Sequence, residues 1–229
     1  MPQKRGKIHG YRYIQLWLER YKAIHRNPKT ILRVMRKYGL SSEVRRRRWQ
    51  GCGHTLHRYS NLLNRDFRAD SPNQKWVTDI SYIPTGQGFV YLSIIRDLFD
   101  NSIVAYKTDR QQTVSVVLNT IHAAMAQEKI AGELTLHSDQ GFQYTSQAYF
   151  NLTKEYGITP SMSRRGNPYD NAPAENFFSI LKTECIGRQK IQSFEQAVQM
   201  IDDYIHFYNY ERIQLKYRLT PFEKRSQTA

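Results

Sequence analysis

The stretch WVTDISYI (residues 76–83) decides the fold class, because it sets an acid inside an otherwise apolar strand pattern. Trp76, Val77 and Ile80 favour a strand, whereas aspartate is depleted from strands. Asp79 therefore needs a reason to stand there. Either it is a surface residue of an edge strand, or it serves chemistry at the sheet.

The pattern continues outward from this strand. The segments GFVYLSIIRDLFD (88–100) and SIVAYKTD (102–109) predict two further strands, separated by turn residues. Short strands are expected in GELTLHSDQG (132–141) and ITPSMS (158–163), and helices over 113–127, 146–155, 171–183 and after Ser193, where Gln196 completes a capping box. This order, β-β-β-α-β-α-β-α-α, predicts one α/β domain with a mixed sheet flanked by helices.

Charge is distributed unevenly along the 229 residues. The net charge is +14, and residues 1–70 hold 18 Lys and Arg against 4 acids, whereas residues 71–229 hold 16 of each. The excess therefore belongs to the front of the chain and indicates a polyanionic partner.

Two short amphipathic helices are predicted in that basic front. Residues 11–21 carry an apolar stripe, and a second helix begins at Asn27-Pro28 and ends at Gly39. The second helix has a basic face formed by Lys29, Arg33, Arg36 and Lys37. Such a pair suits a helix-turn-helix lying against DNA. The alternative is a solvated helix in a basic domain.

The next segment is a basic linker. It opens with four consecutive arginines, Arg45, Arg46, Arg47 and Arg48, which we expect to touch phosphates. Cys52, His54 and His57 lack the second ligand pair of a structural zinc site, which favours loop residues.

The two cysteines, Cys52 and Cys185, give no disulfide framework, and there is neither a membrane-length apolar run nor a secretory leader. We expect a soluble protein of a reducing cytoplasm.

Two further acids accompany Asp79. Asp139 follows a short strand, at the edge where ligands gather in α/β sheets. Glu175 shares a polar helix stripe with Ser179 and Lys182. Three carboxylates suit magnesium, which prefers oxygen ligands, and two such ions about 3.5–4 Å apart support in-line displacement at phosphorus. Taken singly, Asp139 could be a turn residue and Glu175 an ordinary surface acid.

Asp97 and Asp100 could likewise be either catalytic or structural acids. The segment RDLFDN (96–101) resembles a strand running into a turn, and Asp100-Asn101 is turn chemistry. Asp97 is expected to be structural, because a buried acid requires a partner.

The sequence resembles DDE transposases and retroviral integrases, which share a ribonuclease H-like catalytic domain, and in particular the downstream-frame transposases of the insertion-sequence-three family. In that pattern about 35 residues separate the second acid from the helix glutamate, as they do between Asp139 and Glu175. The matching segments cover nearly the whole chain in order: HGYR (9–12), NLLNRDF (61–67), PNQKWVTDISYIPT (72–85), HSDQGFQYTS (137–146), SMSRRGNPYDNAPAENFFSILKTE (161–184) and FYNYERIQLK (207–216).

This resemblance implies roles for individual residues. Asp79, Asp139 and Glu175 would be the catalytic and metal-binding acids, and Lys182 would contact terminal DNA. The loop residues expected to position DNA are Arg164, Arg165, Asn167, Tyr169 and Asn171. Pro173 and Asn176 depart from the family pattern beside Glu175 without removing an acid. The implied domains are a helix-turn-helix-like unit (1–44), a basic linker (45–68) and an integrase-type catalytic domain (69–229).

The resulting hypothesis is metal-dependent DNA strand cleavage and strand transfer with two Mg²⁺ ions, for which Mn²⁺ substitutes. Family likeness also implies double-stranded DNA as partner, a homo-oligomer on DNA, association with the bacterial nucleoid, and an upstream-frame product as a second partner. Two alternatives stay open at this point. One is a non-catalytic DNA-binding regulator derived from a transposase. The other is a ribonuclease H relative that acts on RNA hybrids.

Overall fold

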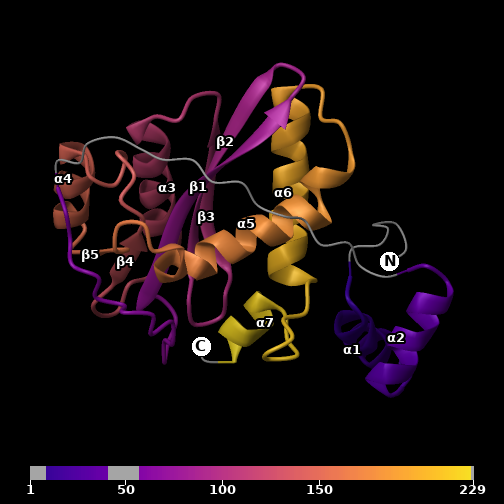
Figure 1. The fold of residues 1–229 in the computed structure, drawn as a ribbon. Helices are drawn as coiled ribbons and strands as arrows, with labels where there is room; N and C mark the ends of the chain where they lie inside the picture. Colours follow the sequence, from indigo (N-terminus) through magenta and orange to yellow (C-terminus); the bar gives the residue numbers. More distant parts are fainter. Residues whose placement is uncertain (1–8, 41–56, 228–229) are drawn as a thin grey trace.

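A five-stranded mixed sheet forms the centre of the protein, whose computed structural model describes residues 9–40 and 57–227. The strand order is β3-β2-β1-β4-β5 (Figure 1). The antiparallel part comprises β1 (Lys75–Thr85), β2 (Gly88–Asp97) and β3 (Ile103–Asp109), and the parallel part adds β4 (Thr135–Ser138) and β5 (Thr159–Met162) to the other side of β1. The predicted α/β class with a mixed sheet is confirmed.

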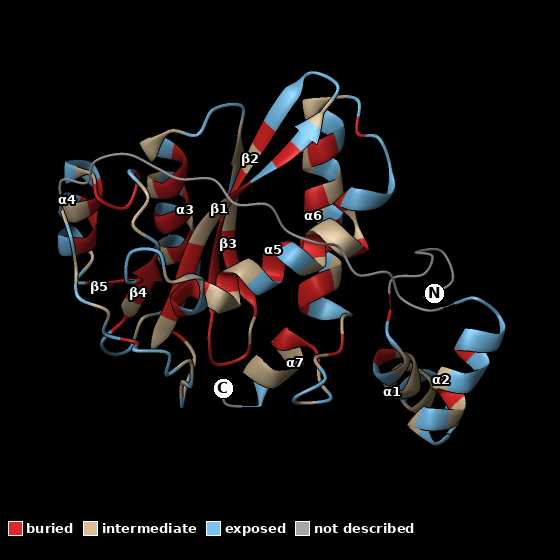
Figure 2. Ribbon diagram, viewed as in Figure 1, coloured by how far each residue is buried: buried red, intermediate tan, exposed pale blue. Residues whose placement is uncertain are grey.

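Helices cover both faces of this sheet (Figures 1 and 2). On one face, α3 (Val114–Gln127) and α4 (Gln147–Glu155) enclose a core that contains Trp76, Ile121 and Leu136. On the other, α5 (Ala172–Glu184) and α6 (Phe194–Tyr210) pack over Ile83 and Leu92. Three short helices complete the body: η2 (Pro168–Asn171), η3 (Ile186–Arg188) and α7 (Pro221–Ser226).

The helix starts follow the capping residues of the sequence, with one difference. The hydroxyl of Ser193 accepts the Gln196 backbone N–H at 3.1 Å, as predicted for α6. The Gln196 side chain, however, accepts from the Gln192 backbone N–H at 2.7 Å and not from Ser193, so the expected capping box is only half formed. A complete capping box, which was not predicted, opens α7 at Thr220 and Glu223.

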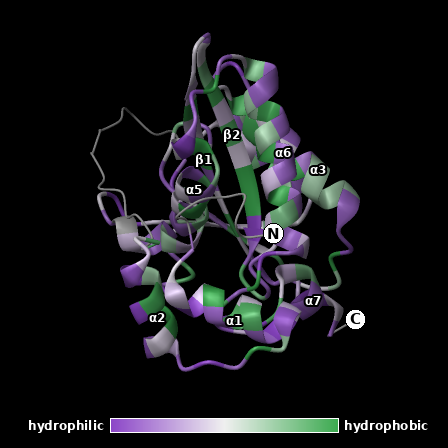
Figure 3. Ribbon diagram, turned by 90° about the vertical axis from the view of Figure 1, so that its right-hand side faces the viewer, coloured by the Kyte–Doolittle hydropathy of each residue, from purple (hydrophilic) through white to green (hydrophobic). Residues whose placement is uncertain are grey.

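The front of the chain forms α1 (Tyr11–Lys22) and α2 (Pro28–Lys37), the expected pair of short helices. The side chain of Asn27 caps α2 by accepting the Lys29 N–H at 2.9 Å. Helix α1 lies beside α7 (Figure 3), where Arg20 forms an ion pair with Glu223. None of the helices in residues 9–40 and 57–227 is long and apolar enough to cross a bilayer.

The predicted linker divides into two parts. Arg45 to Arg48, Cys52 and His54 lie outside the described residues. From residue 57 onward the chain packs on the body: Leu63 is buried with Val77 and Ala174, and the His57 ring contacts Gln147 at 2.9 Å. The described part of the predicted linker is therefore packed against the catalytic domain.

Candidate active site

Three acids from three elements meet at one edge of the sheet. In the parallel pairing of β1 with β4, Val77 lies opposite His137. Asp79 and Asp139 each follow two residues later, so the geometry of the sheet brings them side by side. Glu175 lies in the first turn of α5, and the neighbouring Ala174 packs against Val77. The helix thus presents Glu175 to the two aspartates.

The three carboxylates are close enough for the charge of one to change the pKa of another. Desolvation, followed by the charges of Asp139 and Glu175, raises the pKa of Asp79 well above its ordinary value, while the Lys182 ammonium acts in the opposite direction. Desolvation and the charge of Glu175 also raise the pKa of Asp139, although solvent still reaches its side chain. The edge therefore gathers carboxyl groups whose ionisation is opposed by burial and by one another.

The donor set suits a hard divalent cation. All three groups offer carboxylate oxygen, which Mg²⁺ and Mn²⁺ prefer. One oxygen of Asp79 accepts the Ile80 N–H at 2.8 Å and one of Asp139 accepts the Gly141 N–H at 2.9 Å. Across the described residues, no three His, Cys, Asp or Glu side chains already stand close enough to hold a metal ion. Binding would therefore require the carboxylates to turn toward a shared cation.

The absence of a side chain at Gly141 leaves space for the Asp139 carboxylate. A Cβ atom at this position would lie 2.9 Å from Oδ1 of Asp139 and 3.1 Å from the Gln143 side-chain oxygen. Any other residue would therefore push against the acid. This steric role was not predicted, although a glycine two residues after the acid was its signal in the sequence.

Two buried polar residues that were not predicted lie beneath the site, Tyr144 and His137. The Tyr144 hydroxyl lies 3.3 Å from the Thr78 hydroxyl, and desolvation followed by the Asp79 and Asp139 charges raises its pKa well above the ordinary value. His137 contacts the Ser161 hydroxyl at 2.8 Å through Nδ1, and desolvation lowers its pKa to about 4. The imidazole is therefore a neutral hydrogen-bonding group at neutral pH.

A third missed residue, Asp170, organises the loop before α5. Its side chain is fully buried and accepts bonds from Arg164 Nε at 2.9 Å, Arg65 Nε at 3.0 Å and Asn61 Nδ2 at 3.0 Å. The hydrogen bond from Arg164 is the strongest influence that holds the pKa of Asp170 well below its usual range. Asp170 thus ties the segment ahead of β1 to the start of the acid-bearing helix.

This arrangement bears on the loop residues expected to position DNA. Arg164 is half exposed and bonded to Asp170, whereas Arg165 and Tyr169 are exposed. Asn167 accepts the Tyr169 N–H at 3.2 Å and so caps η2. Asn171 is buried and donates to the Thr78 carbonyl at 3.3 Å, so in this conformation it stabilises the β1–α5 junction. Its DNA contact stays a prediction that requires the loop to open.

The other expected DNA contacts lie at the surface or beside the acids. The basic face of α2 is exposed at all four positions: Lys29, Arg33, Arg36 and Lys37. Lys182 reaches back from α5 to donate to the Ser81 hydroxyl, and its ammonium lies 5.1 Å from the centre of the Tyr82 ring.

Asp97 and Asp100 take no part in this edge. Both side chains are fully buried and accept from Arg225, at 3.0 Å and 2.7 Å. Asp100 also accepts the Ser102 N–H at 2.7 Å, as a turn residue does. The expectation that Asp97 is structural agrees with this pairing.

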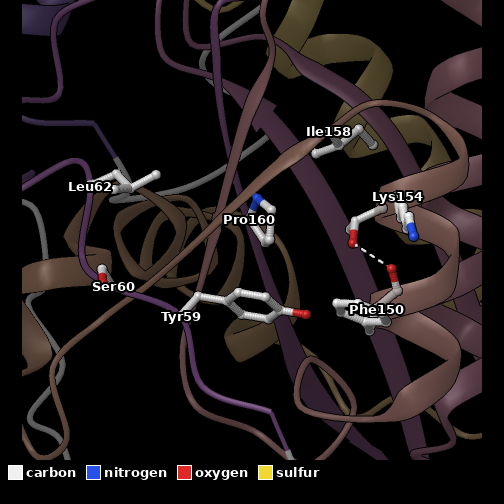
Figure 4. A pocket seen from close by; sticks show the side chains of 8 residues that line it. Tyr59, Ser60, Leu62, Phe150, Lys154, Ile158 and Pro160 are labelled. Carbon is white, nitrogen blue, oxygen red and sulfur yellow. Dashed lines mark hydrogen bonds between the residues drawn. The ribbon is translucent and has the colours of Figure 1, made fainter.

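A separate groove of about 430 Å³ lies between the chain ahead of β1 and the α4–β5 side of the sheet. Tyr59 points across it toward Phe150 of α4, with Pro160 beside them (Figure 4). Its lining is mostly apolar and contains no acid. It is therefore distinct from the carboxylate edge.

A strand acid, a second acid after a parallel neighbour and a helix glutamate define the integrase and transposase class of catalytic domain. Two family models match accordingly, both described as integrase core domain, over residues 69–168 and 175–228. The HTLV-2 integrase catalytic core domain in complex with magnesium shares the fold with a TM-score of 0.54 at 15% identity, covering 69% of this chain and 99% of that one.

Relatives in sequence are more specific. An uncharacterized transposase-like protein of Haemophilus influenzae is 41% identical, over 88% of this chain and 94% of its own. The putative transposase InsK for insertion sequence element IS150 of Escherichia coli is 37% identical, over 99% and 80% respectively. The transposase InsF for insertion sequence IS3A of the same species is 33% identical, over 78% and 63%. The chain belongs to the insertion-sequence-three family of transposases.

Membership confirms the predicted ribonuclease H-like fold and the transposition of an insertion sequence as the function. It places the chain among polynucleotidyl transferases that bind DNA and use divalent metal. The alternative of a non-catalytic regulator is not favoured.

Proposed function

We propose that the chain cleaves DNA strands at the element ends and joins them to target DNA, with Asp79, Asp139 and Glu175 as the catalytic acids. The observation that carries this proposal is the electrostatic coupling of three carboxylates supplied by β1, the end of β4 and the start of α5. Crowding like charges costs stability, and groups with strongly shifted pKa values are therefore concentrated at functional sites.

The proposed cofactor is a pair of Mg²⁺ ions, with Mn²⁺ as a substitute. Such ions, when bound, would activate the attacking oxygen and stabilise the leaving oxygen of the phosphodiester. The chain's part is to hold and orient: Asp79 and Asp139 from the rigid sheet, Glu175 from a helix anchored by Phe177 and Phe178 in the core. The structure of HTLV-2 integrase with magnesium supports the choice of metal.

DNA is expected to cross the acid edge toward the basic front of the chain. Lys182 would pair with a phosphate near the scissile bond, because its ammonium already lies within electrostatic reach of Asp79. The exposed face of α2, the arginines at 45–48 and the loop at 164–171 would hold flanking phosphates. A homo-oligomer would bring two element ends together on the bacterial nucleoid, and an upstream-frame product is a further proposed partner.

The test is Glu175→Gln, which keeps the size of the side chain and removes its charge. With Mg²⁺ and a duplex that carries the element end, we expect cleavage to fall at least 100-fold, because a metal ligand is lost. Glu155→Gln, an exposed acid at the end of α4, is the matched control and should cleave normally. Full activity of Glu175→Gln would remove this residue from the mechanism, and preferential cleavage of an RNA–DNA hybrid would favour a ribonuclease.

A further inference from the structure

Three aromatic side chains line one face of the β1–β2 hairpin: Tyr82 comes from β1, the strand of Asp79, whereas Phe89 and Tyr91 come from β2. Tyr82 lies opposite Tyr91 in the strand register, and Phe89 lies opposite Pro84, so all three rings project to one side. The Tyr82 and Phe89 rings meet edge to face with centres 5.5 Å apart, and Phe89 and Tyr91 are 6.5 Å apart. We call Tyr82, Phe89 and Tyr91 the aromatic strip.

Two rings of the strip are exposed, Tyr91 is half-buried, and the hairpin that carries them is anchored in the core. Tyr82 is 53% exposed and Phe89 is 51% exposed, and the hairpin projects beyond the helices as an alternation of buried and exposed residues (Figure 2). The opposite face of the same hairpin is anchored by Ile83, Val90 and Leu92, all within the core. Solvent-facing rings are therefore fixed in place by a buried face, which preorganises them for a ligand.

A cation adjoins the strip on the side of the acids. The Lys182 ammonium is 5.1 Å from the Tyr82 ring centre and donates to Ser81, which lies between Tyr82 and Ile80 in β1. Tyr82 follows Asp79 by three strand residues, a span of roughly 10 Å. That span is about three stacked base steps of DNA. Because side chains alternate along a strand, Tyr82 lies on the opposite face of the sheet from Asp79. Lys182 joins the two faces, because it bonds to Ser81 on the face of Asp79 and lies against the Tyr82 ring. The pairing of β1 with β4 ends at Val77, so a DNA end could pass from the acids around this edge of β1 to the strip.

We infer that the aromatic strip stacks an unpaired base of the DNA end, next to the phosphodiester that the acids cut. This inference rests on the proposed function and adds a binding site for bases to it. Bases stack on exposed aromatic faces in single-strand binding, and a neighbouring cation holds the phosphate of the same nucleotide. Tyr82 and Phe89 supply the ring surfaces, and Lys182 supplies the cation.

A second copy of the chain is the other occupant that an exposed aromatic face can take. A symmetric contact through the strip would bring Lys182 close to its own counterpart, which like-charge repulsion opposes. DNA, by contrast, matches both the rings and the cation. Nucleic acid is therefore the better occupant.

The experiment measures binding by fluorescence anisotropy in EDTA, so that no cleavage is required. The probes are a blunt 20-base-pair duplex, the same duplex with a four-thymidine 3′ extension, and the same extension built from abasic nucleotides. The wild-type protein should bind the thymidine extension more tightly than the abasic one. Tyr82→Ala and Phe89→Ala should each weaken binding of the thymidine extension by about 5- to 100-fold, with little effect on the blunt duplex.

Conservative variants distinguish a loss of base stacking from a loss of folding and from a loss of hydrophobic surface. Tyr82→Phe and Phe89→Tyr keep a ring and should keep the preference for thymidine, whereas Phe89→Leu keeps apolar volume and should lose it. Leu215→Ala, a comparably exposed apolar residue at 54%, is the matched control and should bind as wild type.

Several outcomes would overturn the inference. Equal wild-type affinity for the thymidine and abasic extensions is one, and a full preference in Phe89→Leu is another. A change of sedimentation in Tyr82→Ala with unchanged DNA binding would assign the strip to contact between copies. The two proposals can fail separately. If the wild-type protein prefers the thymidine extension but the Glu175→Gln variant still cleaves DNA, only the catalytic assignment is overturned. If the wild-type protein cleaves DNA but shows no preference for thymidine over abasic nucleotides, only the strip proposal is overturned.

Discussion

At the scale of single residues, the site depends on residues that help to position the acids and do no chemistry. Gly141 is one, because its missing side chain leaves space for Oδ1 of Asp139. Asp170 is another, because it gathers Arg65, Arg164 and Asn61 into the loop before Glu175. Their effects on activity and on stability should separate.

Gly141→Ala tests the first of these neighbours. The new methyl would meet the free end of the Asp139 side chain at 2.9 Å, and that end can move at little cost. We therefore expect a free energy of unfolding within about 1 kcal/mol of wild type, and a loss of cleavage of at least tenfold because the displaced carboxylate holds metal poorly. Urea unfolding and a cleavage assay measure the two effects. A variant that cleaves normally would show that the carboxylate tolerates displacement.

Asp170→Asn tests the second through its pH dependence. The pKa of Asp170 is lowered in the folded protein from 3.8, so its stabilising effect is complete above that value and is lost as the pH falls through the folded pKa. We expect Asp170→Asn to be less stable by about 1–3 kcal/mol at pH 7, with a gap to wild type that narrows below pH 3.8. Urea unfolding at several pH values measures it.

The matched control for this change is Asp203→Asn, an exposed acid on α6 that should shift stability little. A gap between Asp170→Asn and wild type that is the same at pH 7 and pH 3.5 would contradict the assignment of the carboxylate as the charged partner of Arg164.

At the scale of elements, local pattern predicted most of the strands and helices, because their signals lie within a few residues. Asp79 in a strand of apolar neighbours and Asn27 before Pro28 are examples, and both mark elements that the structure contains. What local pattern could not provide is partnership at long range. Asp170 bonds to Asn61 across 109 positions, and Arg225 to Asp97 across 128. Periodicity carries no information about such pairs.

Helix α7 shows what these pairs contribute to the fold. Arg225 reaches from this short helix to Asp97, Asp100 and Glu128, and it also donates to Asn73 at 2.7 Å. Its side chain is only 14% exposed. The guanidinium is therefore the cation that permits two fully buried aspartates next to β2.

Arg225→Ala should cost about 3–5 kcal/mol of the free energy of unfolding, because it leaves buried carboxylates unpaired. Arg225→Lys should recover only part of this, since an ammonium cannot reproduce the fork of the guanidinium. Lys224→Ala in the same helix removes only aromatic contacts and should cost about 0.5–1 kcal/mol. Thermal or urea unfolding compares the three. Equal stability of Arg225→Ala and Lys224→Ala would contradict the role given to the buried cluster.

At the scale of the whole molecule, the basic front is attached to the helix that carries Glu175. Glu184, nine residues further along α5, pairs with Arg212 at 2.7 Å and lies 3.9 Å from His9, which stacks on Tyr13 of α1. Two turns further along α1, Arg20 pairs with Glu223. If the front helices bind DNA as proposed, these contacts would hold that DNA at a defined place relative to the acids.

The proposed DNA contacts of the front helices predict that these helices contribute to the salt dependence of DNA binding. Each lost phosphate contact lowers the slope of log affinity against log salt by about 0.9. The triple variant Lys29→Ala, Arg33→Ala, Arg36→Ala should therefore lower the slope on duplex DNA by about 2.7 if all three residues touch phosphates.

The control removes three exposed lysines of the body, Lys107, Lys154 and Lys190, so that the total charge changes equally. Binding that depended only on net charge would give both triple variants the same slope. The charge imbalance of the sequence, together with the exposure of the α2 face, predicts a smaller slope for the front variant alone. Anisotropy titrations between 50 and 200 mM salt, a range over which such contacts change affinity strongly, decide between the two.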